Sequence, residues 1–245
     1  MRNAFFILFL GLLFTSHTGF TQQTFPYEWS NQTDLPLLGV GSLTTGVAIY
    51  LDRRVQPLTE AQIRLLDVGQ VAGFDRYATR HYSPQAHQFS NITGLTSIAF
   101  PFALLLDQDN REHSGELLLI TLEGALLNAG LINLTKTIAR RTRPFVYNGS
   151  APMALKLKQS ARFSFYSGHT AVSSFFTFCG AQMYHDIYPG SRSRGAVWAT
   201  AAVIPLLTGY GRVRAGRHFL SDVLVGYGVG ALLGVVVPRL HRLAD

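Results

Sequence analysis

Six apolar stretches, separated by polar segments, are the feature that most restricts how this chain can fold. Each is 14 to 18 residues long, and we interpret all six as helices. They cover Pro36–Leu51, Ile92–Leu106, Leu117–Leu134, Ala171–Tyr184, Ala196–Tyr210 and Val223–Pro238. The sequence therefore predicts an all-α helical bundle of six helices.

A membrane is the favoured environment for this bundle. Charged residues make up only 14% of the chain, against roughly 25% in an average soluble domain. The last stretch also carries four glycines, Gly226, Gly228, Gly230 and Gly234, and small residues allow helices to approach closely in lipid. The stretches are nevertheless shorter than the ~20 residues that usually cross a bilayer, so a soluble all-α bundle is the alternative.

The N-terminus resembles a secretory signal peptide covering residues 1–21. Arg2 supplies the positive start, Ala4–Phe14 the apolar region, and Gly19–Thr21 a plausible cleavage site. An uncleaved membrane helix is the alternative. Residues 22–245 show no repeat and are predicted to form a single domain.

Two connections between the stretches are long. Asp52–Asn91 mixes charged and apolar residues at helical spacing and predicts amphipathic helices at the surface. Thr135–Gly168 is basic, and loops of that length are usually functional. The net charge of +7 does not predict nucleic-acid binding, because the basic residues form short groups without stacking aromatics among them. The single cysteine, Cys179, is predicted to be a small core residue.

A first polar cluster follows the third apolar stretch and contains Lys136, Arg143 and Pro144. Lys136 and Arg143 are seven residues apart, so on a helix they would project from one side after two turns. An ammonium and a planar guanidinium together can neutralise several oxygens of one phosphoryl group. A basic cluster in this place can equally be a membrane topology signal.

A second cluster, Ser167-Gly168-His169, lies at the start of the fourth stretch. Backbone N–H groups at a helix start bind anions, and glycine lets a phosphate approach the backbone. His169 would lie beside such a group, where it can protonate a leaving oxygen. Alternatively, Ser167 is an ordinary N-cap and His169 a polar residue of the first turn.

A third cluster leads into the last stretch and contains Arg212, His218 and Asp222. His218 and Asp222 have the i, i+4 spacing that brings two side chains together on a helix. A carboxylate that accepts from one imidazole nitrogen leaves the other free to attack phosphorus. Arg212 would add a third cation for the phosphoryl oxygens. The pair can also be a structural contact or part of a metal site.

In order and spacing the three clusters resemble the type 2 phosphatidic acid phosphatase superfamily, which includes bacterial class A acid phosphatases and vanadium haloperoxidases. Its pattern is Lys-x6-Arg-Pro, Pro-Ser-Gly-His and Ser-Arg-x5-His-x3-Asp. This chain departs from the pattern at Tyr166, where the family has proline, and at Gly211, where it has serine. The resemblance places the catalytic core at about residues 116–240.

The resemblance implies a metal-independent phosphatase without a cofactor that acts on a phosphomonoester or diphosphate, preferably of a lipid. His218 would form a phosphohistidine, with Asp222 orienting it and His169 protonating the departing alcohol. The phosphate would be held by Lys136, Arg143, Ser167, Gly168 and Arg212. A soluble exported acid phosphatase and a vanadate-dependent haloperoxidase are the alternatives that the same residues allow.

The side of the membrane on which these residues lie is predicted differently by two arguments. Most Lys and Arg residues between the stretches lie in segments 52–91, 135–170 and 211–221, which the positive-inside rule would place in the cytoplasm. The family resemblance instead implies a bacterial inner membrane with the site facing the periplasm. We take the periplasmic side as the expectation, with a soluble periplasmic protein as the alternative.

Overall fold

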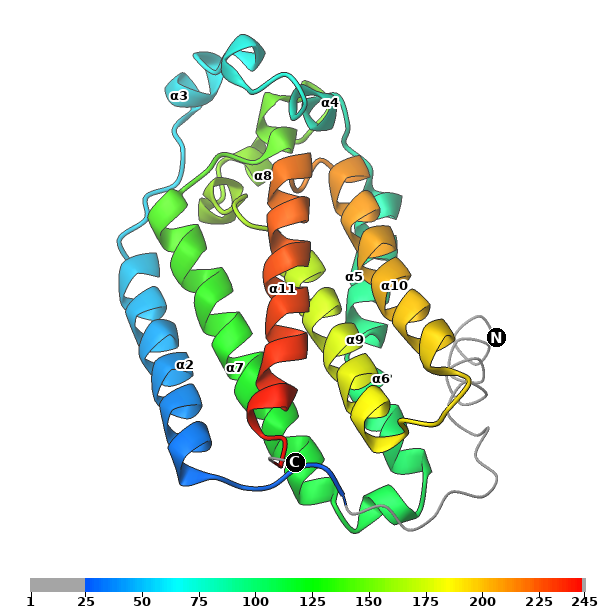
Figure 1. The fold of residues 1–245 in the computed structure, drawn as a ribbon. Coiled ribbons are helices and arrows are strands. Elements are labelled where there is room, and N and C mark those ends of the chain that lie inside the picture. The colour runs from blue at the N-terminus through cyan, green and yellow to red at the C-terminus, as the bar shows by residue number, and fades with distance from the viewer. Residues whose placement is uncertain (1–24, 244–245) are drawn as a thin grey trace.

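The computed structural model describes residues 25–243, and the predicted signal peptide lies outside this range. Six long helices form the body of the molecule: α2 (Asn31–Asp52), α5 (Pro84–Thr96), α7 (Ser114–Ala139), α9 (Gly168–Ile187), α10 (Arg194–Arg214) and α11 (Leu220–Leu240). They run side by side as a bundle (Figure 1). The predicted all-α fold is confirmed, and across residues 25–243 the only pairing of extended backbone is an isolated bridge between Tyr27 and Arg242.

Short helices connect the long ones. Before α5 the chain forms α3 (Glu60–Arg64), η1 (Val68–Gln70) and α4 (Arg76–Thr79). After α7 it forms η4 (Pro144–Tyr147), α8 (Met153–Lys156) and η5 (Gln159–Arg162). Both groups lie at the same end of the bundle and cover the ends of the long helices there (Figure 1).

The predicted helix over Ile92–Leu106 differs most from the structure. Its first helix, α5, begins eight residues earlier, at Pro84, because Ser83 accepts a hydrogen bond from the N–H of Ala86 and Pro84 takes the first helical position. The run then divides into α5, α6 (Ala99–Phe102) and η2 (Ala103–Leu106). Pro101, which has no N–H to donate, lies in this divided part.

The start of α5 also corrects the prediction for segment 52–91. Only short helical pieces form before it, and the last eight residues of the segment belong to a long helix of the bundle instead of to a surface helix. The apolar pattern did not predict this part of α5, because residues 84–91 are largely polar.

Four parts of the described chain are long and apolar enough to cross a membrane, namely Asn31–Asp52, Pro84–Leu106, Ser114–Tyr147 and Leu220–Leu240. Exposed aliphatic side chains line several of them, including Leu35, Leu43, Leu122 and Leu232. These helices support a membrane location. The predicted number of six spanning helices is not confirmed, because α9 and α10 are not among the four.

Helix α9 is the buried centre of the bundle, and α11 packs closely against it through glycines. Three glycines of α11 lie opposite carbonyl oxygens of α9: Gly226 opposite Ser167, Gly230 opposite Ala171 and Gly234 opposite Phe175. A Cβ atom at Gly226 or Gly234 would lie only 2.6 Å from the oxygen it faces. The expected close approach is therefore confirmed for these three, whereas Gly228 has open space around it.

Candidate active site

Four of the long helices bring the predicted site residues to one end of the bundle. Lys136 lies in the last turn of α7, His169 in the first turn of α9, and Arg212 in the last turn of α10. His218 lies in the short connection between α10 and α11. The three sequence clusters, which are far apart in the chain, therefore meet where these helix ends converge.

The imidazole of His218 is completely buried and held in one tautomer. Its Nδ1 lies 2.7 Å from the backbone carbonyl oxygen of Ser164. Because a carbonyl only accepts, Nδ1 must carry the proton, and Nε2 then keeps its lone pair. Within residues 25–243 no side chain or backbone group hydrogen-bonds Nε2. His218 thus presents a free nitrogen lone pair, as a nucleophile requires.

Electrostatics keep His218 in this neutral form. Burial lowers the pKa of His218 well below its usual value of 6.5, and the positive charges of Arg143, Arg212 and Lys136 lower it further. The backbone hydrogen bond to Ser164 opposes this only in part. The lone pair is therefore available at neutral pH.

Asp222 does not hydrogen-bond His218 directly, contrary to the sequence prediction. The closest approach, Nδ1 to Oδ2, is 3.7 Å, which is too long for a hydrogen bond. The i, i+4 argument fails because α11 begins only at Leu220, so His218 lies before the helix. Asp222 instead accepts a 2.5 Å hydrogen bond from the hydroxyl of Ser164, whose carbonyl holds His218. Its effect on the imidazole passes through Ser164.

Arg141 and Asp75 complete this network, and the sequence argument did not identify either as functional. Arg141 donates from Nη1 to Asp222 at 2.5 Å and from Nη2 to Asp75 at 2.7 Å. Asp75 is buried and also accepts from the backbone and hydroxyl of Ser221. The segment before α5 is thereby attached to the start of α11. No local pattern around Asp75 signals this contact, because its partners are at least 66 residues away.

Two buried guanidinium groups, those of Arg143 and Arg212, lie close to His218. Arg143 and Arg212 are 9% and 2% exposed, and their Nε atoms, like that of Arg217, have no hydrogen-bond partner among residues 25–243. The predicted two helical turns between Lys136 and Arg143 are wrong, because α7 ends at Ala139. A left-handed residue, Arg140, reverses the chain there, and a loop brings Arg143 to the site.

The start of α9 lies directly against Lys136. A Cβ atom at Gly168 would be 2.9 Å from Lys136 Nζ, so only glycine leaves the ammonium in its present place. Gly168 begins the helix, as predicted, with its N–H at the positive end of the helix dipole. The N–H of Ser167, however, donates to the backbone carbonyl of Asp222 at 3.0 Å and is not available to an anion.

Helix α5 adds residues to the site that the sequence argument missed. Arg212 donates from Nη1 to Nδ1 of His87 at 2.9 Å, and the same nitrogen lies 3.4 Å from Ser90 and Asn91. The Ser83-Pro84 pair, a common start of a helix, was the signal that could have placed these residues on a long helix.

The two departures from the family pattern have local explanations. Tyr166 is 3% exposed and packs with Ile132 and Ala171, so a large apolar ring fills the position of the usual proline. A Cβ atom at Gly211 would lie 2.9 Å from Cβ of Ser90. Glycine at 211 therefore permits the close contact between α10 and α5.

Taken together, these groups define the class of site. A buried imidazole lone pair lies near the cations Lys136, Arg143 and Arg212, which form no ion pair with a carboxylate of residues 25–243, and a second histidine stands at an adjacent helix start. Unpaired buried cations are costly unless an anion neutralises them. The arrangement fits phosphoryl transfer to histidine, with cations for the phosphoryl oxygens.

Comparison with known proteins identifies the family. Residues 117–244 match the model of the PAP2 superfamily, and the chain belongs to this superfamily. The matched region contains all eight residues of the predicted site but not Asp75 or His87.

Two individual proteins are similar to the chain. The lipid A 1-phosphatase of Porphyromonas gingivalis is 34% identical over 122 residues, which are 49% of this chain and 23% of that protein. The chain thus spans less than a quarter of that relative. A transmembrane PAP2-type phosphatidylglycerolphosphate phosphatase from Bacillus subtilis is 21% identical, with 98% of this chain and 94% of that chain covered and a TM-score of 0.39.

The network around Asp75 gives a testable expectation. Asp75→Asn removes the buried carboxylate that pairs with Arg141, and we expect it to cost about 1–3 kcal/mol of stability, because the guanidinium loses its charged partner. The phosphatase kcat should fall with little change in KM, since the altered group acts through Asp222. Thermal unfolding and steady-state kinetics measure both. Asp67→Asn, an exposed aspartate of the same segment, is the control, and equal effects of the two variants would contradict the expectation.

Proposed function

We propose that this protein is a membrane-embedded phosphatase that hydrolyses a phosphomonoester or diphosphate of a lipid. The family membership and the free Nε2 lone pair of His218 among buried cations support the activity. The name of the Porphyromonas gingivalis relative, a lipid A 1-phosphatase, supports a lipid substrate.

The reaction follows from the positions of the two histidines. Nε2 of His218 attacks phosphorus, the bond from phosphorus to the alcohol oxygen breaks, and His169 gives that oxygen its proton. Burial and the charges of Arg212, Lys136 and Arg143 lower the pKa of His169 to about 3 in the free site, so His169 takes up this proton only when the bound phosphate neutralises those cations. Water then attacks the phosphohistidine, loses its proton to His169, and releases inorganic phosphate with His218 restored. Lys136, Arg143 and Arg212 bind the phosphoryl oxygens as charge develops on them. Gly168 leaves room for Lys136 and offers its N–H, and Ser167, whose own N–H is engaged, fixes the start of α9.

The observation that carries the choice of a lipid is an apolar pocket beside His169. It has a volume of about 330 Å³ and lies between α5 and α9. Its walls include Leu95, Ile98 and Val172. Because His169 protonates the leaving oxygen, the leaving alcohol must occupy the space next to it, and that space is lined by aliphatic side chains.

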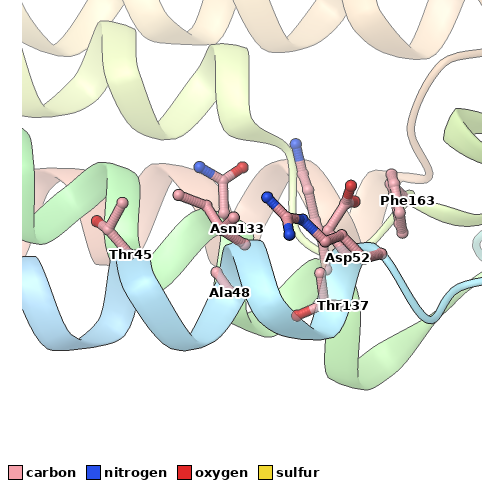
Figure 2. Close-up of a pocket in the computed structure, with 9 residues that line it drawn as sticks. Thr45, Ala48, Asp52, Asn133, Thr137 and Phe163 are labelled. Carbon is pink, nitrogen blue, oxygen red and sulfur yellow. The ribbon is translucent and has the colours of Figure 1, made fainter.

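A second pocket opens on the other side of the site, between α2 and α7. It has a volume of about 210 Å³, and Lys136 is one of its lining residues. Thr45 and Ala48 of α2 and Asn133 of α7 form its walls (Figure 2). Lys136 therefore borders both the phosphate site and this pocket, and the pocket could take part of a headgroup larger than a single phosphate.

In the membrane we propose that α2, the α5–α6 pair, α7, α9, α10 and α11 form one embedded bundle, with the site facing the periplasm of a bacterial inner membrane. The four apolar segments support the embedding. A reporter fused after residue 150 tests the side, because that position lies at the site end of the bundle. A cytoplasmic reporter signal would reverse the assignment and agree with the distribution of Lys and Arg.

A substrate panel tests the proposed function. Phosphate release by the full chain in detergent is measured with phosphatidic acid, a prenyl diphosphate, lipid A, glycerol phosphate and p-nitrophenyl phosphate. We expect kcat/KM for at least one lipid to exceed that for glycerol phosphate by about 100-fold or more, because the alcohol of glycerol phosphate buries little apolar surface. Faster turnover of the water-soluble phosphoesters would contradict the lipid proposal, and halide oxidation with added vanadate but no phosphate release would contradict the phosphatase.

A pair of variants links this preference to the pocket. Leu95→Gln places a polar group in the pocket wall, whereas Leu118→Gln places the same group on an exposed face of α7 outside both pockets. Only Leu95→Gln should lower the ratio of kcat/KM for a lipid phosphate to kcat/KM for a water-soluble phosphoester.

A further inference from the structure

A second cluster of chemically active groups lies at the opposite end of the bundle from His218. It consists of Asp34 in the first turn of α2, Glu123 in α7 and His241 directly after α11. The 21 residues of α11 separate it from the candidate active site by about 30 Å. In Figure 1 this end is the lower one, where the C-terminus and the start of α2 meet.

The histidine of this cluster directs one nitrogen at two carboxylates. His241 Nδ1 lies 2.8 Å from the carbonyl oxygen of Val237 and must therefore donate to it. The other nitrogen, Nε2, lies 2.9 Å from Asp34 Oδ1 and 3.0 Å from Glu123 Oε2. In a neutral imidazole this nitrogen carries a lone pair. Nε2 of His241 and the oxygens of Asp34 and Glu123 are then three electron-pair donors directed at one small region.

The cluster also contains an unsatisfied oxygen and two acidic groups that lie close together. Glu123 is completely buried, and its Oε1 has no hydrogen-bond partner within residues 25–243. If both carboxylates were ionised and the imidazole neutral, the cluster would carry two negative charges in a place where Asp34 is only 6% exposed. Such charge is very costly without compensation, and a divalent cation would balance it.

We propose that Asp34, Glu123 and His241 bind a divalent transition-metal ion such as Mn²⁺ or Zn²⁺. One imidazole nitrogen with two carboxylate oxygens is a donor set that these ions accept. The ligand atoms lie within 4.8 Å of one another, so small side-chain shifts would bring them within the roughly 4.4 Å that two bonds of about 2.2 Å to one ion allow.

Neighbouring groups hold the ligands in the orientation that a metal site needs. The hydrogen bond from Nδ1 to Val237 fixes the tautomer that frees Nε2, which is the usual support for a metal-binding histidine. The backbone N–H of Ser30 donates to the second oxygen of Asp34 at 3.0 Å and leaves Oδ1 for the ion.

A metal here would join three helices that are distant in sequence. The same region holds the bridge between Tyr27 and Arg242 and the hydrogen bond from the N–H of Glu28 to the carbonyl of His241. The ion would fasten both terminal parts of the described chain to α7. Its effect is on stability, because the phosphoryl chemistry lies about 30 Å away.

The test uses the full chain purified in detergent, stripped with a chelator and titrated with Mn²⁺ or Zn²⁺. We expect one bound ion per chain by elemental analysis and a rise in Tm of about 5–10 °C at 100-fold excess over Kd. Both effects should disappear in His241→Gln and in Glu123→Gln. His113→Gln, which alters another histidine near a glutamate at the same end, should retain them.

The measurement on the unmodified chain decides the matter even if a variant fails to fold. A stripped chain that takes up neither ion and keeps the same Tm in their presence overturns the proposal, and the cluster then shares protons instead of holding a metal. Uptake that persists in folded His241→Gln and Glu123→Gln, as judged by circular dichroism, also overturns it, because the ion would lie elsewhere.

Discussion

Phosphate release is expected to fall by roughly 10³- to 10⁶-fold when His218 is replaced by alanine, because the nucleophile is lost and only the binding groups remain. The reason is structural: Nε2 of His218 is the only imidazole lone pair that we find both buried and surrounded by the cations of Lys136, Arg143 and Arg212 within residues 25–243. The loss should appear in kcat, with substrate binding largely kept.

A direct measurement separates this role from a structural one. The full chain is mixed with substrate labelled with ³²P and quenched in alkali, where phosphohistidine survives. The wild type should hold the label, and His218→Ala should not. His185→Ala, in the last turn of α9 at the far end from the site, is the control and should label normally. A labelled His218→Ala enzyme would place the nucleophile on another residue.

The second large effect is expected for His169→Ala, and it should depend on the leaving group. With an alkyl phosphate the rate should fall by about 10²- to 10⁴-fold, because the alcohol must receive a proton as it departs. With p-nitrophenyl phosphate the first turnover should change much less, since p-nitrophenolate leaves without a proton. Single-turnover kinetics with the two substrates measure the difference.

The same variant also reports on the second half of the reaction. If His169 activates the attacking water, phosphohistidine should accumulate in His169→Ala after the first turnover with p-nitrophenyl phosphate. Gly94→Ala is a suitable control, because its added Cβ would meet the His169 ring at 3.6 Å, an ordinary contact that leaves the imidazole in place. Equal losses with both substrates would show that His169 positions the phosphate and does not supply a proton.

The helices were predictable from the sequence where apolar residues dominate, and their ends were not. Five of the six predicted stretches lie within single helices, whereas Ile92–Leu106 divides into α5, α6 and η2. Helix α5 begins eight residues before that stretch, and α7 ends at Ala139, five residues later than predicted. Helix ends at this site carry polar side chains such as His87 and Lys136, which interrupt an apolar pattern although the backbone continues as a helix. Pattern length therefore underestimates helices that lead into a polar site.

The candidate site was predictable to the extent that its residues lie in short sequence clusters. All three clusters meet in space, and their assigned roles stay predictions until the variants are measured. The sequence argument did not identify Asp75 and Arg141, because their contacts are long-range. It did not identify Ser164, because Ser164 contacts His218 through its backbone carbonyl. The direct bond between His218 and Asp222 was a wrong inference, since residue spacing means little where no helix has begun.

The glycine contacts between α11 and α9 have a consequence for how such a site can diversify. Gly226 of α11 faces Ser167, which directly precedes α9. The contact therefore fixes the helix that carries His169 against the helix that begins two residues after His218. The contact between α11 and α9 thereby sets the distance between the attacking group, His218, and the proton donor, His169. The walls of the apolar pocket come partly from α5, outside this pair. Substitutions on α5 can therefore change which alcohol is accepted while the geometry of attack and departure stays constant.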